Sequence, residues 1–306
     1  MSSRAGGILA LTLAGLAVSS AVPSAQQPAF RATTALVSVS ASVKRGNTVV
    51  ANLTAADFVL TDNGVAQTVD AVSIESVPID VTLFLDTSGS TSGKLDEMRH
   101  DVQSILQLLR PTDRFRLLTI GDTVNTPVPW VPAGTKVDPS LEVVGGISLI
   151  RDALMLGLVH KTDPGRRHLI VGMTDREDCG SVVPGSLLLD VAGRSDAVLH
   201  LVDYSGSGAG DRYRVRGCSP RARPDGEAAI TRAAERTGGE LHKQSRLFRG
   251  SSIARAFKTI FDDFRQSYVL RYSPHGVTAS GWHAIVVRVP KVGDATIRAR
   301  QGYYGE

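Results

Sequence analysis

The sequence predicts an α/β fold: a doubly wound, mostly parallel sheet with helices on both faces, plus a small β domain from the N- and C-terminal flanks. Three observations support this. Residues 81–85 form a continuous apolar run, which is typical of a strand buried on both faces of a sheet. Strand and helix patterns then alternate as far as residue 264. On either side of this region the chain reads as short strands separated by turns.

Length and composition exclude several classes of protein. The chain has 306 residues, of which 42% are hydrophobic and 21% charged. These values suit roughly two folded domains and differ from those of a disordered or collagen-like chain. A net charge of +4 and an aromatic content of 5% do not indicate a nucleic-acid partner. The seven histidines are scattered, without a pair at metal-binding spacing.

Residues 1–25 predict a secretory signal peptide. Arg4 precedes an apolar run over residues 6–22, and small residues cluster at its end. The run is shorter than the roughly 20 residues that span a membrane comfortably. An uncleaved N-terminal anchor is the alternative. Because no later segment is long and apolar enough to span, we expect an exported protein, periplasmic or extracellular, with no membrane span after the signal peptide.

Residues 26–77 are expected to form an N-terminal β segment. Residues 36–43 alternate between apolar and small polar side chains, and a turn follows at residues 45–47. Asn63-Gly64 separates two further strand-like runs, which is a strong hairpin signal. A β unit of this size is marginally stable by itself.

Residues 78–265 are expected to form the α/β domain. Its strands are predicted at residues 81–85, 115–120, 168–173 and 197–202. Its helices are predicted at residues 95–109, 150–158, 187–191, 226–235 and 252–264. Residues 266–306 return to strands at 268–272, 283–289 and 295–300. Because both flanks are small, we expect 266–306 to pack with 26–77, with the α/β domain inserted between them.

Polar side chains follow two of the predicted strands and precede one predicted helix. Asp86, Ser88 and Ser90 follow the strand at 81–85, Ser148 precedes the helix at 150–158, and Asp175 follows the strand at 168–173. Open α/β sheets bind ligands at the carboxyl ends of their strands, so these side chains are expected to converge. A helix N-cap with turn hydroxyls at residues 86–90 is the alternative.

This pattern resembles a von Willebrand factor A (VWA) domain with its metal-ion-dependent adhesion site. The residues that carry the resemblance are Asp86, Ser88, Ser90, Ser148 and Asp175. The sequence departs from the family pattern at two positions: Ser148 stands where the family usually has Thr, and Arg176 where it usually has Gly. A site that no longer binds metal is therefore an alternative.

The flanks resemble a bacterial family of secreted VWFA-related proteins first recognised in Acidobacteria. Leu53-Thr54-Ala55-Ala56-Asp57-Phe58 and Asp62-Asn63-Gly64-Val65-Ala66-Gln67 are similar to the N-terminal signature of that family. Tyr268-Val269-Leu270-Arg271-Tyr272 and Gly302-Tyr303-Tyr304 are similar to its C-terminal end. The resemblance covers nearly all of the chain after the predicted signal peptide.

The ligand types point to a hard cation. Carboxylate and hydroxyl oxygens select Mg²⁺, or else Mn²⁺ or Ca²⁺, over zinc or copper. Asp86 and Asp175 balance the charge of the cation, and neutral hydroxyls leave it attractive to a further oxygen. The resemblance implies that this oxygen comes from an Asp or Glu of a protein ligand. We therefore expect a non-catalytic adhesion or scaffolding protein. A Mg²⁺-dependent phosphoryl-transfer enzyme with Asp86 as its nucleophile is the alternative.

The expected export bears on the state of the two cysteines, Cys179 and Cys218. Paired cysteines are common in oxidising compartments, so we expect a disulfide between them. Two separate buried thiols are the alternative, because the sequence does not show their distance.

Overall fold

The fold is described from a computed structural model of the chain. The structure describes residues 36–74, 76–89, 95–143, 145–174, 176–203, 224–243 and 253–305. Residues Thr34–Glu306 make up one compact unit. The signal peptide predicted at residues 1–25 lies outside the described residues and stays a prediction.

A six-stranded, mostly parallel sheet forms the centre of the α/β part, in the order β11-β10-β9-β6-β7-β8. Its strands are β6 (Ile79–Asp86), β7 (Arg114–Ile120), β8 (Val124–Pro132), β9 (Arg167–Thr174), β10 (Val198–Asp203) and β11 (Leu241–His242). Every residue of β6 and of β9 is buried, as the apolar run at 81–85 predicts. Strand β8 is antiparallel to β7 and was not predicted. It contains Pro127 and Pro129, and prolines are tolerated only in edge strands.

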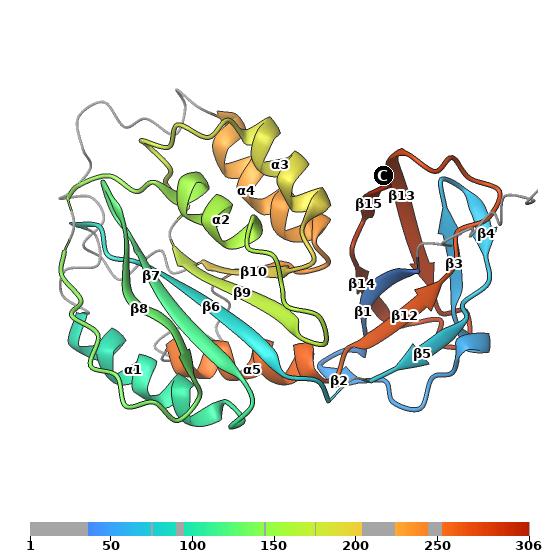
Figure 1. The fold of residues 1–306 in the computed structure, drawn as a ribbon, viewed down its shortest axis with the longest axis horizontal. Helices are drawn as coiled ribbons and strands as arrows, with labels where there is room; N and C mark the ends of the chain where they lie inside the picture. The colour runs from blue at the N-terminus through green and yellow to red at the C-terminus, as the bar shows by residue number, and fades with distance from the viewer. Residues whose placement is uncertain are drawn as a thin grey trace, which may run out of the picture. The chain divides into compact units, whose positions relative to one another are not determined.

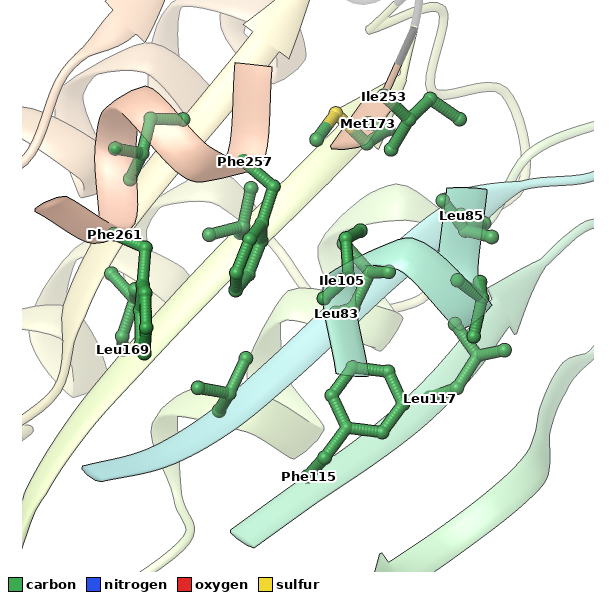
Figure 2. Close-up of a cluster of buried hydrophobic side chains, with 14 of the residues drawn as sticks. Leu83, Leu85, Ile105, Phe115, Leu117, Leu169, Met173, Ile253, Phe257 and Phe261 are labelled. Carbon is green, nitrogen blue, oxygen red and sulfur yellow. The ribbon is translucent and has the colours of Figure 1, made fainter. Parts of the chain in front are cut away.

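Within the described part of the chain, five helices cover the two faces of this sheet (Figure 1). They are α1 (Leu95–Leu108), α2 (Ile150–Leu158), α3 (Gly185–Arg194), α4 (Pro224–Arg236) and α5 (Ile253–Arg265). Side chains of α1 and α5 share one hydrophobic cluster with one face of the sheet, and those of α2, α3 and α4 share another with the opposite face. Figure 2 shows Phe257 and Phe261 of α5 and Ile105 of α1 packed over Leu83 and Leu169 of the strands. The predicted doubly wound α/β architecture is confirmed.

The two flanks of the chain pair with each other in antiparallel sheets. One sheet has the order β14-β1-β12-β5, with β2 beside β1, and the other has the order β15-β13-β3-β4. The N-terminal members are β1 (Val37–Arg45), β2 (Thr48–Val49), β3 (Val59–Asp62), β4 (Val65–Gln67) and β5 (Ala71–Ser73). The C-terminal members are β12 (Tyr268–Tyr272), β13 (Gly281–Arg288), β14 (Thr296–Ala299) and β15 (Gly302–Gly305). The small β domain predicted from both flanks is thus present, while the boundaries 26–77, 78–265 and 266–306 stay predictions.

The predicted hairpin between β3 and β4 forms at Asn63-Gly64. Both residues have positive φ, 47° and 82°, which is the backbone that Asn-Gly adopts most easily in a two-residue turn. A short 3₁₀ turn, Ala55–Asp57, precedes β3 and is capped by Thr54, whose backbone N–H donates to the Asp57 carboxylate at 2.8 Å.

Among the described residues, no helix is long and apolar enough to cross a membrane.

Candidate functional site

Asp86 is the last residue of β6 and forms the centre of the candidate site. Its side chain is buried, with 1% of the residue exposed. The backbone N–H of Ser88 donates to its Oδ1 at 3.0 Å, and the backbone N–H of Thr87 donates to the carbonyl of Ile120 at 2.9 Å. The loop therefore turns sharply after the strand and is attached to the end of the neighbouring strand β7.

Ser148 reaches Asp86 from a different segment. Its hydroxyl lies 3.2 Å from each carboxylate oxygen of Asp86. Gly145, three residues earlier, has φ of +67°, a backbone conformation that favours glycine. Ser148 also pairs with Asp178 in an isolated parallel bridge, and its carbonyl accepts from the Cys179 N–H at 3.2 Å. These contacts connect the Ser148 segment with the loop that follows β9.

Thr174, the last residue of β9, was not among the predicted ligands. Its hydroxyl donates to Asp86 Oδ2 at 3.0 Å and accepts from the backbone N–H of Arg176 at 3.0 Å. Thr174 is 1% exposed. Its place directly after the predicted strand at 168–173 was the available signal, because parallel strands end at the same edge of a sheet. Three segments of the chain thus meet at the Asp86 carboxylate.

Arg176 occupies the position where a glycine was expected from the family pattern. Its φ is +65°, in the left-handed region that favours glycine. Its guanidinium donates to Asp203 of β10 at 3.0 Å and also pairs with Glu227 of α4. Arg176 forms these ion pairs from an unfavourable backbone conformation. They connect the loop after β9 with β10 and α4.

The structure places three of the five predicted ligands. Asp86, Ser88 and Ser148 lie together at the carboxyl end of β6, and all three are buried. Ser90 and Asp175 lie outside the described residues, so their part in the site stays a prediction. Cys218 also lies outside them, and the disulfide that we expect between it and Cys179 stays a prediction as well.

The donors that the structure brings together fit a hard cation. They are a carboxylate and neutral hydroxyls, which are the oxygen ligands that Mg²⁺, Mn²⁺ and Ca²⁺ prefer. The hydroxyls of Ser148 and Thr174 now donate to Asp86. A hydroxyl also has lone pairs with which it can accept a cation after rotation about its C–O bond. The chemistry of the donor set therefore agrees with the predicted metal.

A second group of ligand-type side chains lies elsewhere on the central sheet. His200 of β10, His242 of β11 and Glu240 each present an atom within 4.8 Å of the others. The sequence had shown no metal-spaced pair of histidines. The group forms because β10 and β11 are neighbours in the sheet, and a Glu-x-His spacing at 240–242 was the only local signal.

The chain was also compared with known proteins. No protein-family model matches it, and no curated protein matches it. Its structure is similar to that of a von Willebrand factor type A protein from Catenulispora acidiphila, with 10% identity over 88% of this chain and 73% of that one and a TM-score of 0.45. It is also similar to an aerotolerance-related membrane protein from Bacteroides fragilis, with 16% identity over 61% and 98% and a TM-score of 0.41.

BatB from Bacteroides thetaiotaomicron is a third similar structure, with 15% identity over 60% of this chain and 96% of that one and a TM-score of 0.40. At identities and TM-scores this low, the likeness concerns the fold and says nothing of function. The doubly wound arrangement of strands and helices rests on the sheet order and helix layers described above.

Proposed function

We propose that this chain binds an acidic side chain of a protein ligand through a divalent cation. The cation is Mg²⁺, or else Mn²⁺ or Ca²⁺, and its ligands are Asp86, Ser88, Ser90, Ser148 and Asp175. The observation that supports the proposal is the meeting of three chain segments at the Asp86 carboxylate, with Ser148 and Thr174 both in hydrogen-bond contact with it. This arrangement collects oxygen donors at the edge where open α/β sheets bind ligands.

Each described residue has a separate part in this proposal. Asp86 supplies negative charge, and Thr174 holds the orientation of its carboxylate. Ser148 supplies a neutral oxygen from the segment before α2. A bound cation would offer an open coordination position to a carboxylate oxygen of the ligand. The charge of Arg176 is engaged by Asp203 and Glu227, so this guanidinium is held within the fold while the ligand binds.

The proposal includes export of the protein to the periplasm or the outside of the cell, and a Cys179–Cys218 disulfide. It assigns adhesion or scaffolding to the chain, without a catalytic step. Phosphoryl transfer with Asp86 as nucleophile is less favoured, because both carboxylate oxygens already accept hydrogen bonds and the residue is 1% exposed. Trapping of an acyl-phosphate on Asp86, or release of phosphate from a phosphorylated substrate, would support that alternative.

Metal binding is tested first, on the purified chain. Isothermal titration with Mg²⁺ and Ca²⁺, and electron paramagnetic resonance with Mn²⁺, should detect one site. Asp86→Asn keeps the shape of the side chain but removes its charge, and should weaken binding by about tenfold or more. Asp294→Asn is the matched control, because Asp294 is exposed and forms an ion pair with the exposed Arg45. Equal affinity in wild type and Asp86→Asn would contradict the proposal.

Ligand binding is tested next. The immobilised chain is exposed to proteins from the native cell envelope, with Mg²⁺ or with chelator, and bound proteins are displaced with a short Asp-containing peptide. A specific ligand should bind with Mg²⁺, leave with chelator or peptide, and fail to bind Asp86→Asn. If envelope proteins stay bound to the chain in the presence of chelator, their binding does not need the cation, and the proposal is contradicted.

A further inference from the structure

We infer that His200, Glu240 and His242 form a second metal site, specific for a divalent transition metal of the zinc class. His200 lies on β10, His242 is the last residue of the neighbouring parallel strand β11, and Glu240 directly precedes that strand. This position is separated from Asp86 of β6 by the intervening strand β9. The inference is independent of the proposed magnesium site, because the two share no residue.

The distances between the candidate ligand atoms are close to those that a zinc ion requires. His200 Nδ1 and His242 Nε2 lie 3.0 Å apart, and His242 Nε2 lies 3.6 Å from Glu240 Oε1. Zinc–nitrogen bonds of about 2.0–2.1 Å in a tetrahedron place ligand atoms about 3.3 Å apart. Shifts of a few tenths of an ångström would therefore bring these two pairs of atoms to that spacing, and the ligand atoms of all three residues lie within 4.8 Å of one another. Two imidazoles and one carboxylate are also the ligand set of several zinc sites with an open position.

The protonation state of the two rings suits metal binding. Burial, with the neighbouring His242, Arg298 and Lys44 charges, holds the pKa of His200 well below its ordinary value. Burial, with Arg298 and Lys44, lowers the pKa of His242 to about 4. Both rings are therefore neutral at pH 7, which is the form that binds metals. One of the two facing nitrogens now carries a hydrogen, and binding requires only that this proton move to the other nitrogen of the same ring.

The surroundings supply a partner for the carboxylate and room for a further ligand. Arg298 of β14 forms an ion pair with Glu240 Oε1 at 2.8 Å, which orients the carboxylate. A small cavity beside His200 is lined also by Ser40, Ser42, Asp263 and Arg298. The three side chains leave the fourth position of a tetrahedral site for water or a small anion. Imidazole ligands favour Zn²⁺ over Mg²⁺ and Ca²⁺, so the two sites would differ in metal.

The test is a zinc titration of the purified chain, read by competition with a chromophoric chelator. We expect one equivalent of Zn²⁺ to bind. His242→Gln and Glu240→Gln should each lower the affinity by about tenfold or more, while Asp86→Asn should leave it unchanged. His100→Gln is the matched control, because His100 is an exposed histidine of α1. No zinc uptake by wild type, or equal affinity in wild type and His242→Gln, would overturn the inference.

Cobalt spectroscopy keeps the inference testable even if a variant fails to fold. Co²⁺ added to the wild-type chain should develop the intense visible bands of four-coordinate cobalt, and an equivalent of Zn²⁺ should remove them. The weak spectrum of six-coordinate cobalt would contradict a His₂Glu site. If the wild-type chain binds Zn²⁺ but not Mg²⁺, only the proposed function is overturned. If it binds Mg²⁺ but not Zn²⁺, only this inference is overturned.

Discussion

The hydroxyl of Ser148 lies 3.2 Å from both carboxylate oxygens of Asp86, although the two residues are 62 positions apart in the chain. Ser148 comes from the segment before α2, and Asp86 ends β6. The contact shows that two loops distant in sequence share one buried carboxylate.

Replacing Ser148 should separate the role of its hydroxyl from that of its packing. Ser148→Ala should weaken Mn²⁺ binding by about tenfold and lower the free energy of unfolding by about 1 kcal/mol, since a hydrogen bond is lost. Ser148→Thr keeps the hydroxyl and should bind Mn²⁺ like wild type. Ser186→Ala, at an exposed position in α3, is the control. Normal Mn²⁺ affinity in Ser148→Ala would remove Ser148 from the ligand set.

The backbone of Arg176 allows a comparison of two substitutions. Arg176→Ala removes the ion pairs with Asp203 and Glu227 and keeps a side chain at φ +65°. We expect it to lower the free energy of unfolding by about 1–3 kcal/mol, because the partly buried Asp203 loses its ion pair with Arg176. Arg176→Gly loses the same pairs but removes the left-handed strain, and should be more stable than Arg176→Ala by about 0.5–1 kcal/mol. Urea unfolding measures the free energy of unfolding of both variants. Equal values would contradict the prediction that the backbone at residue 176 is strained.

Reduction of the expected disulfide should weaken metal binding. The Cys179 N–H donates to the carbonyl of Ser148, so a bridge at Cys179 would restrain the backbone of a predicted ligand. Intact mass under non-reducing conditions should be two hydrogens lower than after reduction. Mn²⁺ affinity should then fall on reduction, and fall equally in Cys218→Ser without reductant. Unchanged affinity after verified reduction would exclude this coupling.

The β domain should lose stability at alkaline pH. Asp62 is fully buried and accepts hydrogen bonds from Tyr272 at 2.8 Å, Tyr303 at 3.1 Å and His283 at 2.9 Å. Burial, with contributions from Asp62, raises the pKa of Tyr303 from 10.0 to about 12, and burial also raises the pKa of Tyr272. The unfolded chain therefore releases phenol protons at a lower pH than the folded chain does.

The stability due to these phenols is present below pH 10 and is lost as the pH rises from 10.0 through about 12. Each phenol contributes a slope of up to about 1.4 kcal/mol per pH unit in that window. Urea unfolding at several pH values measures the slope, and Tyr303→Phe should reduce it. A wild-type free energy of unfolding that stays constant across this window would contradict the prediction.

Much of the fold could be predicted from the sequence, because burial on two faces and helical spacing are local patterns. The run at 81–85 and the helix at 95–109 correspond closely to β6 and α1. Strand β8 was missed, since its prolines make it unlike an interior strand. Strand β15 was also missed: Gly302–Gly305 is short and pairs only with its distant partner β13 among the described strands.

The sequence by itself determined which polar residues follow a buried strand or precede a helix, and hence that Asp86 and Ser148 belong at one edge of the sheet. Only the tertiary structure decided which oxygen atoms meet there. Thr174 contacts Asp86 because β6 and β9 are neighbours, and His200 contacts His242 because β10 and β11 are neighbours. Strand order is set by packing over the whole chain, and local periodicity carries no information about it.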